Sequence, residues 1–116
     1  MLRLLIDAHF NQRILRGLRL RVPLLDVVIV QDTAMQGLQD PLLLQEAAVL
    51  QRVPVTHDLK TVPRHAYARV AAGESMPGIM AVPDDLPIGQ AIEDLHVVVE
   101  CCTDHELANQ VLYLPL

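Results

Sequence analysis

The sequence predicts an α/β protein, a three-layer sandwich with a mainly parallel five-stranded sheet and helices on both faces. Short β-branched runs alternate with amphipathic helical patterns, which is typical of β–α–β units. Two of the runs, VVIV and GIMAV, are continuously apolar, as expected of strands that are buried on both faces. The 116 residues suffice for one domain with a real core, spanning residues 1–116, but not for two.

The first half of the chain supplies three strands and two helices. The strands are expected at Leu2–Ile6, Asp26–Val30 and Val53–Thr56, and the helices at Phe10–Leu20 and Asp40–Gln51. Pro23 ends the first helix. Asp40 and Pro41 open the second, because aspartate caps a helix N-terminus and proline tolerates the first helical position.

The second half adds two strands and three helices. A helix with Pro63 in its first turn stops at Gly73, and it is followed by a strand at Gly78–Val82, a helix from Pro87 to Glu100, a short helix at Asp104–Asn109 and a strand at Val111–Leu114. The β-branched run after His96 could end the long helix early. The last strand would form an exposed edge of the sheet, which suggests a homodimer contact.

Four apolar runs end in aspartate, at Asp7, Asp32, Asp58 and Asp84. With the first strand central, right-handed crossovers give the strand order 2-1-3-4-5. Its switch point lies between strands 1 and 3, where open α/β sheets bind ligands, so Asp7 and Asp58 would be neighbours. Because clustered carboxylates repel one another unless a cation intervenes, we expect a divalent metal site there. Asp32 and Asp84 follow outer strands and are interpreted as solvated loop residues.

Charge is distributed unevenly along the chain. All nine Lys and Arg residues lie within residues 1–69, whereas residues 70–116 carry eight acidic residues and no basic one. Such asymmetry can mark a nucleic-acid or protein contact, but patchy surfaces are common, and we interpret Arg13, Arg16 and Arg19 as arginines that solvate the outer face of the first helix. With one Phe, two Tyr and no Trp, an aromatic stacking platform for single-stranded nucleic acid is excluded.

The chain carries no sign of secretion or membrane insertion. Asp7 interrupts the apolar start, so no signal peptide is visible, and no apolar run approaches the ~18 residues of a membrane span. We therefore expect a cytoplasmic protein. Its only cysteines, Cys101 and Cys102, are adjacent and lack the second pair that a thiolate zinc site needs.

Three segments together resemble the PIN-like nuclease superfamily: LLIDAHF, QDPLLLQEAAVLQRVPVTHD and MPGIMAV. Within them, Asp7 follows the first strand, Asp40 opens an apolar helix, and Thr56-His57-Asp58 follows the third strand. The whole run is similar to a compact branch of that superfamily of unknown function, related to the toxin-type ribonucleases of bacterial toxin–antitoxin pairs.

The resemblance implies a metal-dependent endoribonuclease in which Asp7, Asp40 and Asp58 hold Mg²⁺ or Mn²⁺. RNA would be the substrate, and a partner antitoxin protein could hold the enzyme inactive. Carboxylate oxygens are the ligands that Mg²⁺ prefers. The metal would orient a water for in-line attack and neutralise charge on the phosphate.

The sequence departs from the branch at two motifs. Lys60 stands where the branch often has a second acid after the third strand, and Ala8 and His9 replace Glu-Asn after Asp7. A lysine beside three carboxylates could replace one metal's charge, or it could bind phosphate as a point charge, and both roles are open.

The remaining polar residues have simpler interpretations. Asp7 and Asp58 each sit where a helix begins and could be only caps. His9 could reach the cleft from the first loop. His57 alternates with its neighbours at the strand end and points away from them, which favours a packed histidine over a base.

Two alternatives compete with the ribonuclease. Lys60, the missing fourth acid and the net charge of −5 favour a catalytically degenerate PIN-like module that binds a protein or RNA. A response-regulator-like receiver also uses strand-end aspartates, but this chain lacks the paired acids after the first strand and the late lysine of that class.

Overall fold

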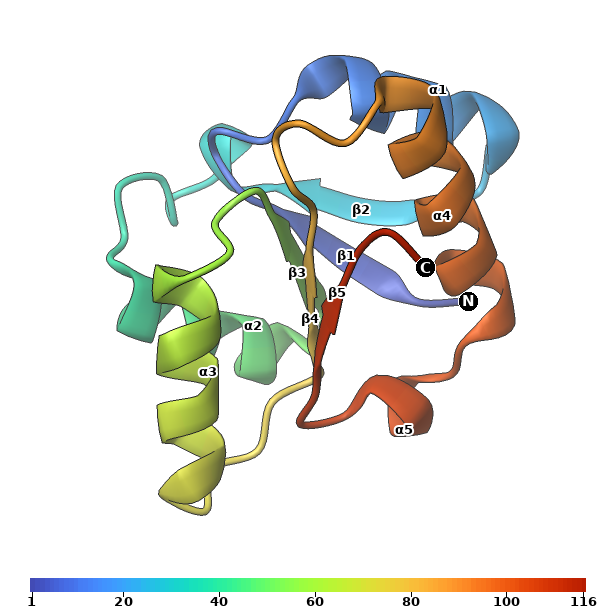
Figure 1. Cartoon of the computed structure of the whole chain (residues 1–116). Coiled ribbons are helices and arrows are strands. Elements are labelled where there is room, and N and C mark those ends of the chain that lie inside the picture. The colour runs from blue at the N-terminus through green and yellow to red at the C-terminus, as the bar shows by residue number, and fades with distance from the viewer.

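The computed structural model describes residues 1–116 as three layers with one sheet in the middle (Figure 1). The strands are β1 (Arg3–Ile6), β2 (Asp26–Ile29), β3 (Val53–Thr56), β4 (Ile79–Ala81) and β5 (Val111–Tyr113). They lie in the order β2-β1-β3-β4-β5 and every neighbouring pair is parallel. The predicted fold class and strand order are therefore confirmed, and the sheet is parallel throughout.

Helices cover both faces of this sheet (Figure 1). α1 (Gln12–Arg21) and α4 (Ile88–Cys101) pack together on one face, and α2 (Asp40–Leu50) and α3 (Thr61–Ala71) on the other. Two short helices, η1 (Val30–Asp32) and α5 (Asp104–Leu107), lie in the connections. α4 continues through its β-branched run because Val98 and Val99 are buried, so packing outweighs the local preference. None of these helices combines the length and apolar character that crossing a bilayer requires.

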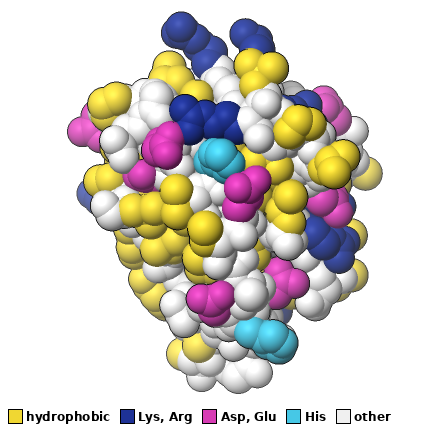
Figure 2. Space-filling view, turned by 90° about the vertical axis from the view of Figure 1, so that its right-hand side faces the viewer, with side chains coloured by type: hydrophobic (Ala, Val, Ile, Leu, Met, Phe, Trp, Pro, Cys, Tyr) yellow, Lys and Arg dark blue, Asp and Glu magenta, His cyan; other side chains and the backbone are white.

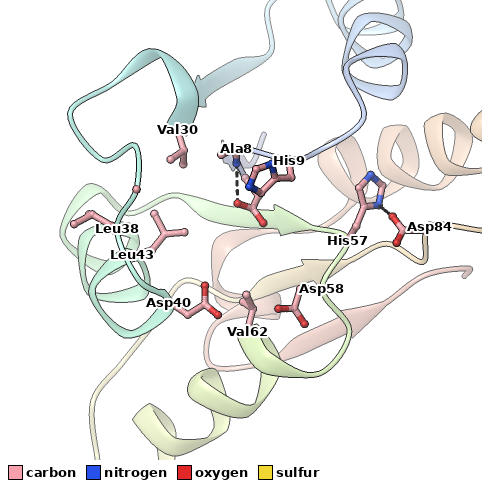
Figure 3. Close-up of a pocket in the computed structure, with 12 residues that line it drawn as sticks. Ala8, His9, Val30, Leu38, Asp40, Leu43, His57, Asp58, Val62 and Asp84 are labelled. Atoms are coloured by element: carbon pink, nitrogen blue, oxygen red, sulfur yellow. Dashed lines mark hydrogen bonds and ion pairs between the residues drawn. The ribbon is translucent and has the colours of Figure 1, made fainter.

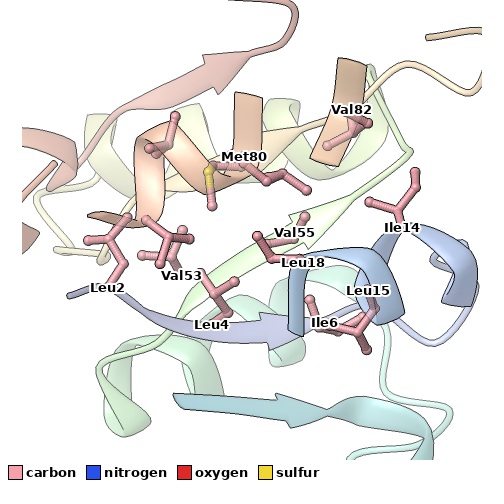
Figure 4. Close-up of a cluster of buried hydrophobic side chains, with 14 of the residues drawn as sticks. Leu2, Leu4, Ile6, Ile14, Leu15, Leu18, Val53, Val55, Met80 and Val82 are labelled. Carbon is pink, nitrogen blue, oxygen red and sulfur yellow. The ribbon is translucent and has the colours of Figure 1, made fainter. Parts of the chain in front are cut away.

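The core has two parts because the strands are buried on both faces. Leu4 and Ile6 of β1 join the larger cluster beneath α1 and α4, whereas Leu5 between them joins a smaller cluster beneath α2. Figure 4 shows the larger cluster, in which Ile14, Leu15 and Leu18 of α1 face residues of β1, β3 and β4. Each fully buried side chain of this size contributes about 1.5–3 kcal/mol, so β1 and β3 are firmly anchored.

The start of α2 differs from the expectation. The prediction that Asp40 caps this helix is wrong, because the helix begins at Asp40 itself and Gln39 occupies the cap position. The backbone N–H of Leu43 donates to the carbonyl of Gln39, and no N–H of the helix reaches the Asp40 carboxylate. That carboxylate is therefore free for another role.

The last strand, β5, forms one edge of the sheet as expected. Tyr113 is 43% exposed there, and its hydroxyl lies 3.2 Å from that of Tyr67 on α3. This hydrogen bond, with burial, raises the pKa of Tyr113 to about 12, so its hydroxyl carries no charge at neutral pH. The homodimer contact through this edge stays a prediction.

Gly78 offers a test of how tightly β4 is placed. Its φ is +104°, and a Cβ at this position would collide with the backbone carbonyl of Leu107. We expect Gly78→Ala to lower the free energy of unfolding in urea by more than about 2 kcal/mol. Gly73→Ala is the matched control, since Gly73 has φ +81° but open space around it, and should cost only about 1–2 kcal/mol. Equal losses in the two variants would contradict the close contact.

Candidate functional site

A pocket of about 490 Å³ opens at the carboxyl edge of the sheet. Its wall includes Asp7 from the loop after β1, Asp40 from the start of α2 and Asp58 from the loop after β3. The chain leaves β1 toward α1 on one face and leaves β3 toward α3 on the other, which creates the crevice typical of a switch point. The three predicted site residues thus line one pocket, and Figure 3 labels Asp40 and Asp58 among its lining residues.

Thr56 connects two of these acids. It is only 2% exposed, and its hydroxyl donates to Asp7 Oδ2 at 2.8 Å and accepts from the backbone N–H of Asp58 at 3.0 Å. Asp7 Oδ1 accepts from the N–H of Ala8 at 2.7 Å. This buried hydroxyl was not singled out from the sequence, although a threonine that ends an apolar strand directly before an aspartate is the signal that could have identified it.

Asp58 lies two residues before Lys60, the N-cap of α3, and it both accepts N–H groups at the start of this helix and lines the pocket. Its Oδ1 accepts from the N–H groups of Lys60 at 2.9 Å and Thr61 at 2.8 Å, at the start of α3. Burial raises the pKa of this carboxyl, but hydrogen bonds from the backbone N–H groups of residues 60–62 and the charge of Arg64 outweigh it and hold the pKa below its ordinary value. Asp58 is therefore ionised at neutral pH.

Asp40 experiences the opposite environment. Burial, the charge of Asp58 and the charge of Asp7 raise its pKa, and His65 opposes them only in part. Its carboxylate has no hydrogen-bond partner, and in Figure 3 it points toward the carboxylate of Asp58 beside Val62. The pocket therefore concentrates negative charge that the protein itself does not neutralise.

The donor set fits a hydrated divalent ion better than a dehydrated one. No group of three acidic, histidine or cysteine side chains converges closely enough to hold a metal ion unaided. Mg²⁺ is commonly bound through one or two carboxylates and keeps several waters. Asp40 has both oxygens free and Asp58 has one, whereas both oxygens of Asp7 already accept a hydrogen bond. Each oxygen of Asp7 keeps a second lone pair, so all three acids can donate to a cation, and the oxygens without a hydrogen bond belong to Asp40 and Asp58.

His57 lines the pocket wall but is committed to structure. Its Nδ1 donates to the carbonyl of Val82 at 2.8 Å, and its Nε2 accepts from the N–H of Asn11 at 3.1 Å. The ring also stacks on Phe10 with centroids 4.4 Å apart. Both ring nitrogens are thus engaged in hydrogen bonds to other loops. His57 therefore holds three loops together and has no free nitrogen for a metal or a substrate proton. This agrees with the packed histidine expected from the sequence.

The rim of the pocket adds charged groups of both signs. Asp84 is exposed, as expected, yet it lines the pocket and its Oδ1 lies 3.5 Å from Nδ1 of His57. His9 is exposed in the wall, within the loop from which it was expected to reach the cleft. Lys60 and Arg64 are exposed next to the wall and form no ion pair. Two basic residues therefore flank the acids without forming an ion pair with them, although the charge of Arg64 acts on Asp58.

Comparisons with protein-family models, curated proteins and solved structures found no match to this chain. The resemblance to the PIN-like superfamily therefore stays a prediction from the sequence.

The Thr56 hydroxyl should be essential for holding Asp7 and Asp58 in place. Thr56→Val keeps the shape of the side chain but leaves a buried carboxylate oxygen and an N–H without their partner. We expect the free energy of unfolding to fall by about 1–3 kcal/mol. Thr56→Ser keeps the hydroxyl and should cost about 1 kcal/mol or less, for its lost methyl group. Chemical denaturation measures both, and an equal loss in the two variants would argue against the bridging role.

Asp40 should destabilise the folded protein at neutral pH. Because its pKa is raised on folding, its stabilising contribution is fully present below its unfolded value of 3.8 and is lost as the pH rises through the folded pKa. Relative to wild type, Asp40→Asn should therefore gain stability between about pH 3 and about pH 7. Thermal melts across this range measure the difference in stability between Asp40→Asn and the wild type. If the wild type gains on the variant as the pH rises, the acidic cluster is not repulsive.

Proposed function

We propose that this chain is a metal-dependent endoribonuclease of the PIN-like type, with Mg²⁺ or Mn²⁺ at the pocket of Asp7, Asp40 and Asp58. The single observation that carries the proposal is that three acids from separate elements line one pocket and that two of them raise the pKa of the third. Perturbed carboxylates in a cleft are typical of functional sites.

In this proposal the acidic residues hold the ion and its water, and the basic residues attract the phosphodiester. Asp40 and Asp58 would hold the ion, which supplies charge neutralisation at the phosphate and an oriented water. Asp7, fixed by Thr56 and the N–H of Ala8, would stand close enough to orient a water ligand. Lys60 and Arg64 would attract the phosphodiester, Lys60 as a point charge and Arg64 through its planar guanidinium.

We propose further that the enzyme is the toxin of a toxin–antitoxin pair, restrained by an antitoxin protein. The sequence resemblance alone supports this role. An adjacent reading frame that encodes a small protein able to suppress the RNA cleavage would support it, and full activity in the presence of that protein would count against it.

A catalytically degenerate module that binds RNA or a protein is the second candidate. Two observations favour it: no three donors converge on one point, and Lys60 stands near the acids. Isothermal titration with Mn²⁺ separates the candidates. Binding at micromolar concentration that is lost in Asp58→Asn would exclude the degenerate module, and no binding at millimolar concentration would favour it.

The ribonuclease predicts a specific pattern of variants. Asp7→Asn and Asp58→Asn should each reduce Mn²⁺-dependent cleavage of a mixed single-stranded RNA by at least about 100-fold, because each removes a negative charge at the ion. Asparagine retains a side-chain oxygen for the N–H groups at the start of α3, so Asp58→Asn should remain folded by circular dichroism.

Asp32→Asn is the matched control for these variants. Asp32 also lies in the connection after a strand at the same edge of the sheet, in η1 after β2, but it does not line the pocket. Its variant should cleave RNA as the wild type does. Unchanged cleavage in both Asp7→Asn and Asp58→Asn would rule out the proposed site.

A further inference from the structure

α1 presents a row of unpaired arginines. Arg13, Arg16 and Arg19 follow at intervals of three residues and lie exposed along one side of the helix. None of them forms an ion pair, whereas Arg21 at the end of the helix pairs with Glu93. Figure 2 shows basic side chains projecting from the upper part of the molecule, over α1. Three guanidinium groups are therefore uncompensated on this surface.

This arrangement is unfavourable for the helix itself. Like charges three residues apart repel each other, and α1 contains no acidic residue to relieve them. Arg13 also occupies the first turn, where the helix dipole favours acids and disfavours cations. Arg19 lies in the last turn, where the dipole favours a cation, so the uncompensated charges are those of Arg13 and Arg16. Positions that break a local rule without a compensating contact are often functional, and the start of the row therefore points to an anionic ligand outside the chain.

Hydrogen bonds join the start of this row to the carboxylate pocket. The N–H of Phe10 donates to the carbonyl of Asp7 at 3.1 Å, and the N–H of Asn11 donates to His57. The Asn11 side chain then accepts from the N–H of Arg13 at 2.9 Å. Asp7 and His57 line the pocket, so these bonds link its wall to the start of α1, and Arg13 follows the last wall residue before the helix, His9, by four positions.

The row also borders a shallow hollow of about 270 Å³. It is lined by Arg16 and Arg19 together with Gln12, Leu15 and Leu20, and Leu20 is 78% exposed. A guanidinium can bind phosphate with two parallel hydrogen bonds, and an apolar neighbour can contact a ribose or a base. The hollow therefore offers a nucleotide both a cationic contact for its phosphate and an apolar contact for its ribose or base.

We propose that Arg13, Arg16 and Arg19 bind the phosphate backbone of the single-stranded RNA whose cleavage site enters the carboxylate pocket. This arginine track rests on the proposed function, because the pocket identifies the anion as RNA. Its continuity with the pocket favours RNA over an acidic protein, which could dock anywhere on the helix. The track also gives a protein of net charge −5 a local positive field for a polyanion.

Fluorescence anisotropy with a labelled RNA of about ten nucleotides, in EDTA to prevent cleavage, tests the track. Arg16→Gln with Arg19→Gln should weaken binding about tenfold and reduce the slope of log K against log salt by about 1.4, because each phosphate contact on a single strand contributes about 0.7. Glutamine is a good helix former and both positions are exposed, so the variant should fold.

The matched control removes the same number of charges from arginines that are already held in ion pairs. Arg3 and Arg21 each form an exposed ion pair, with Asp26 and Glu93, so Arg3→Gln with Arg21→Gln should fold and change the affinity less than about twofold. Equal losses in the two double variants would overturn the track, because they would report only net charge.

Two further outcomes distinguish the track from the ribonuclease. Mn²⁺-dependent cleavage by the wild type, with RNA affinity unchanged by Arg16→Gln and Arg19→Gln, would overturn the track and leave the ribonuclease standing. A selective loss of RNA affinity in a protein that cleaves nothing would support the track and count against the ribonuclease. Wild-type binding to polyglutamate but not to RNA would overturn the track in favour of an acidic protein.

Discussion

The pairing of β1 with β3 is the constraint on which the site depends. The two central strands run in parallel with Ile6 opposite Val55, and the ladder continues as the N–H of Asp7 donates to the carbonyl of Val55 at 3.1 Å. This register places Asp7 beside Thr56, whose hydroxyl reaches it. A slip of one residue would turn Thr56 to the opposite face and separate the acids. Burial of both strands on both faces makes such a slip costly, so the core itself fixes the geometry of the pocket.

The sequence predicted the elements that depend on burial. β3 was predicted with the bounds it has, and the strand order followed from the central place of the first strand, because apolar runs and right-handed crossovers leave few alternatives. The neighbouring strand ends of Asp7 and Asp58 followed from the same rule. Only the ends of several elements moved, by one or two residues.

Details that depend on loop geometry were not accessible from the sequence. Asp40 was expected to cap α2, but it is the first residue of that helix, and Gln39 is the cap. The Asp40 carboxylate is therefore free of the helix N–H groups. Asp84 was interpreted as a solvated loop residue, and it is solvated, yet the path of the chain after β4 carries it to the pocket rim. Neither outcome follows from periodicity, because both depend on how a few backbone dihedral angles direct the chain.

Asp58 shows that a carboxylate can stabilise the start of a helix and line the pocket at the same time, although the sequence set these two roles against each other. One carboxylate oxygen satisfies the first N–H groups of α3, and the same hydrogen bonds keep the group ionised. Asp58 therefore provides the charge that raises the pKa of Asp40 across the pocket. The helix N-terminus lowers the pKa of Asp58, while burial and the charge of Asp58 raise the pKa of Asp40, and an added cation would relieve the second effect.

The uneven charge along the chain becomes an uneven surface in the fold. Residues 1–69 form β1 to β3, α1, α2 and most of α3, and they contain every Lys and Arg as well as three of the four acids that line the pocket. Residues 70–116 contribute eight acids, including Asp84 at the pocket rim, and no Lys or Arg. A polyanion would therefore be attracted along α1 and around the start of α3 and repelled from α4 and α5. Exposed charges act over about 10 Å at moderate salt. A nucleic-acid chain is therefore within the field of the arginines only while it stays close to α1. In the proposed ribonuclease, an RNA held on α1 would reach the crevice at the ends of β1 and β3, where its phosphates and the acids would need a cation between them.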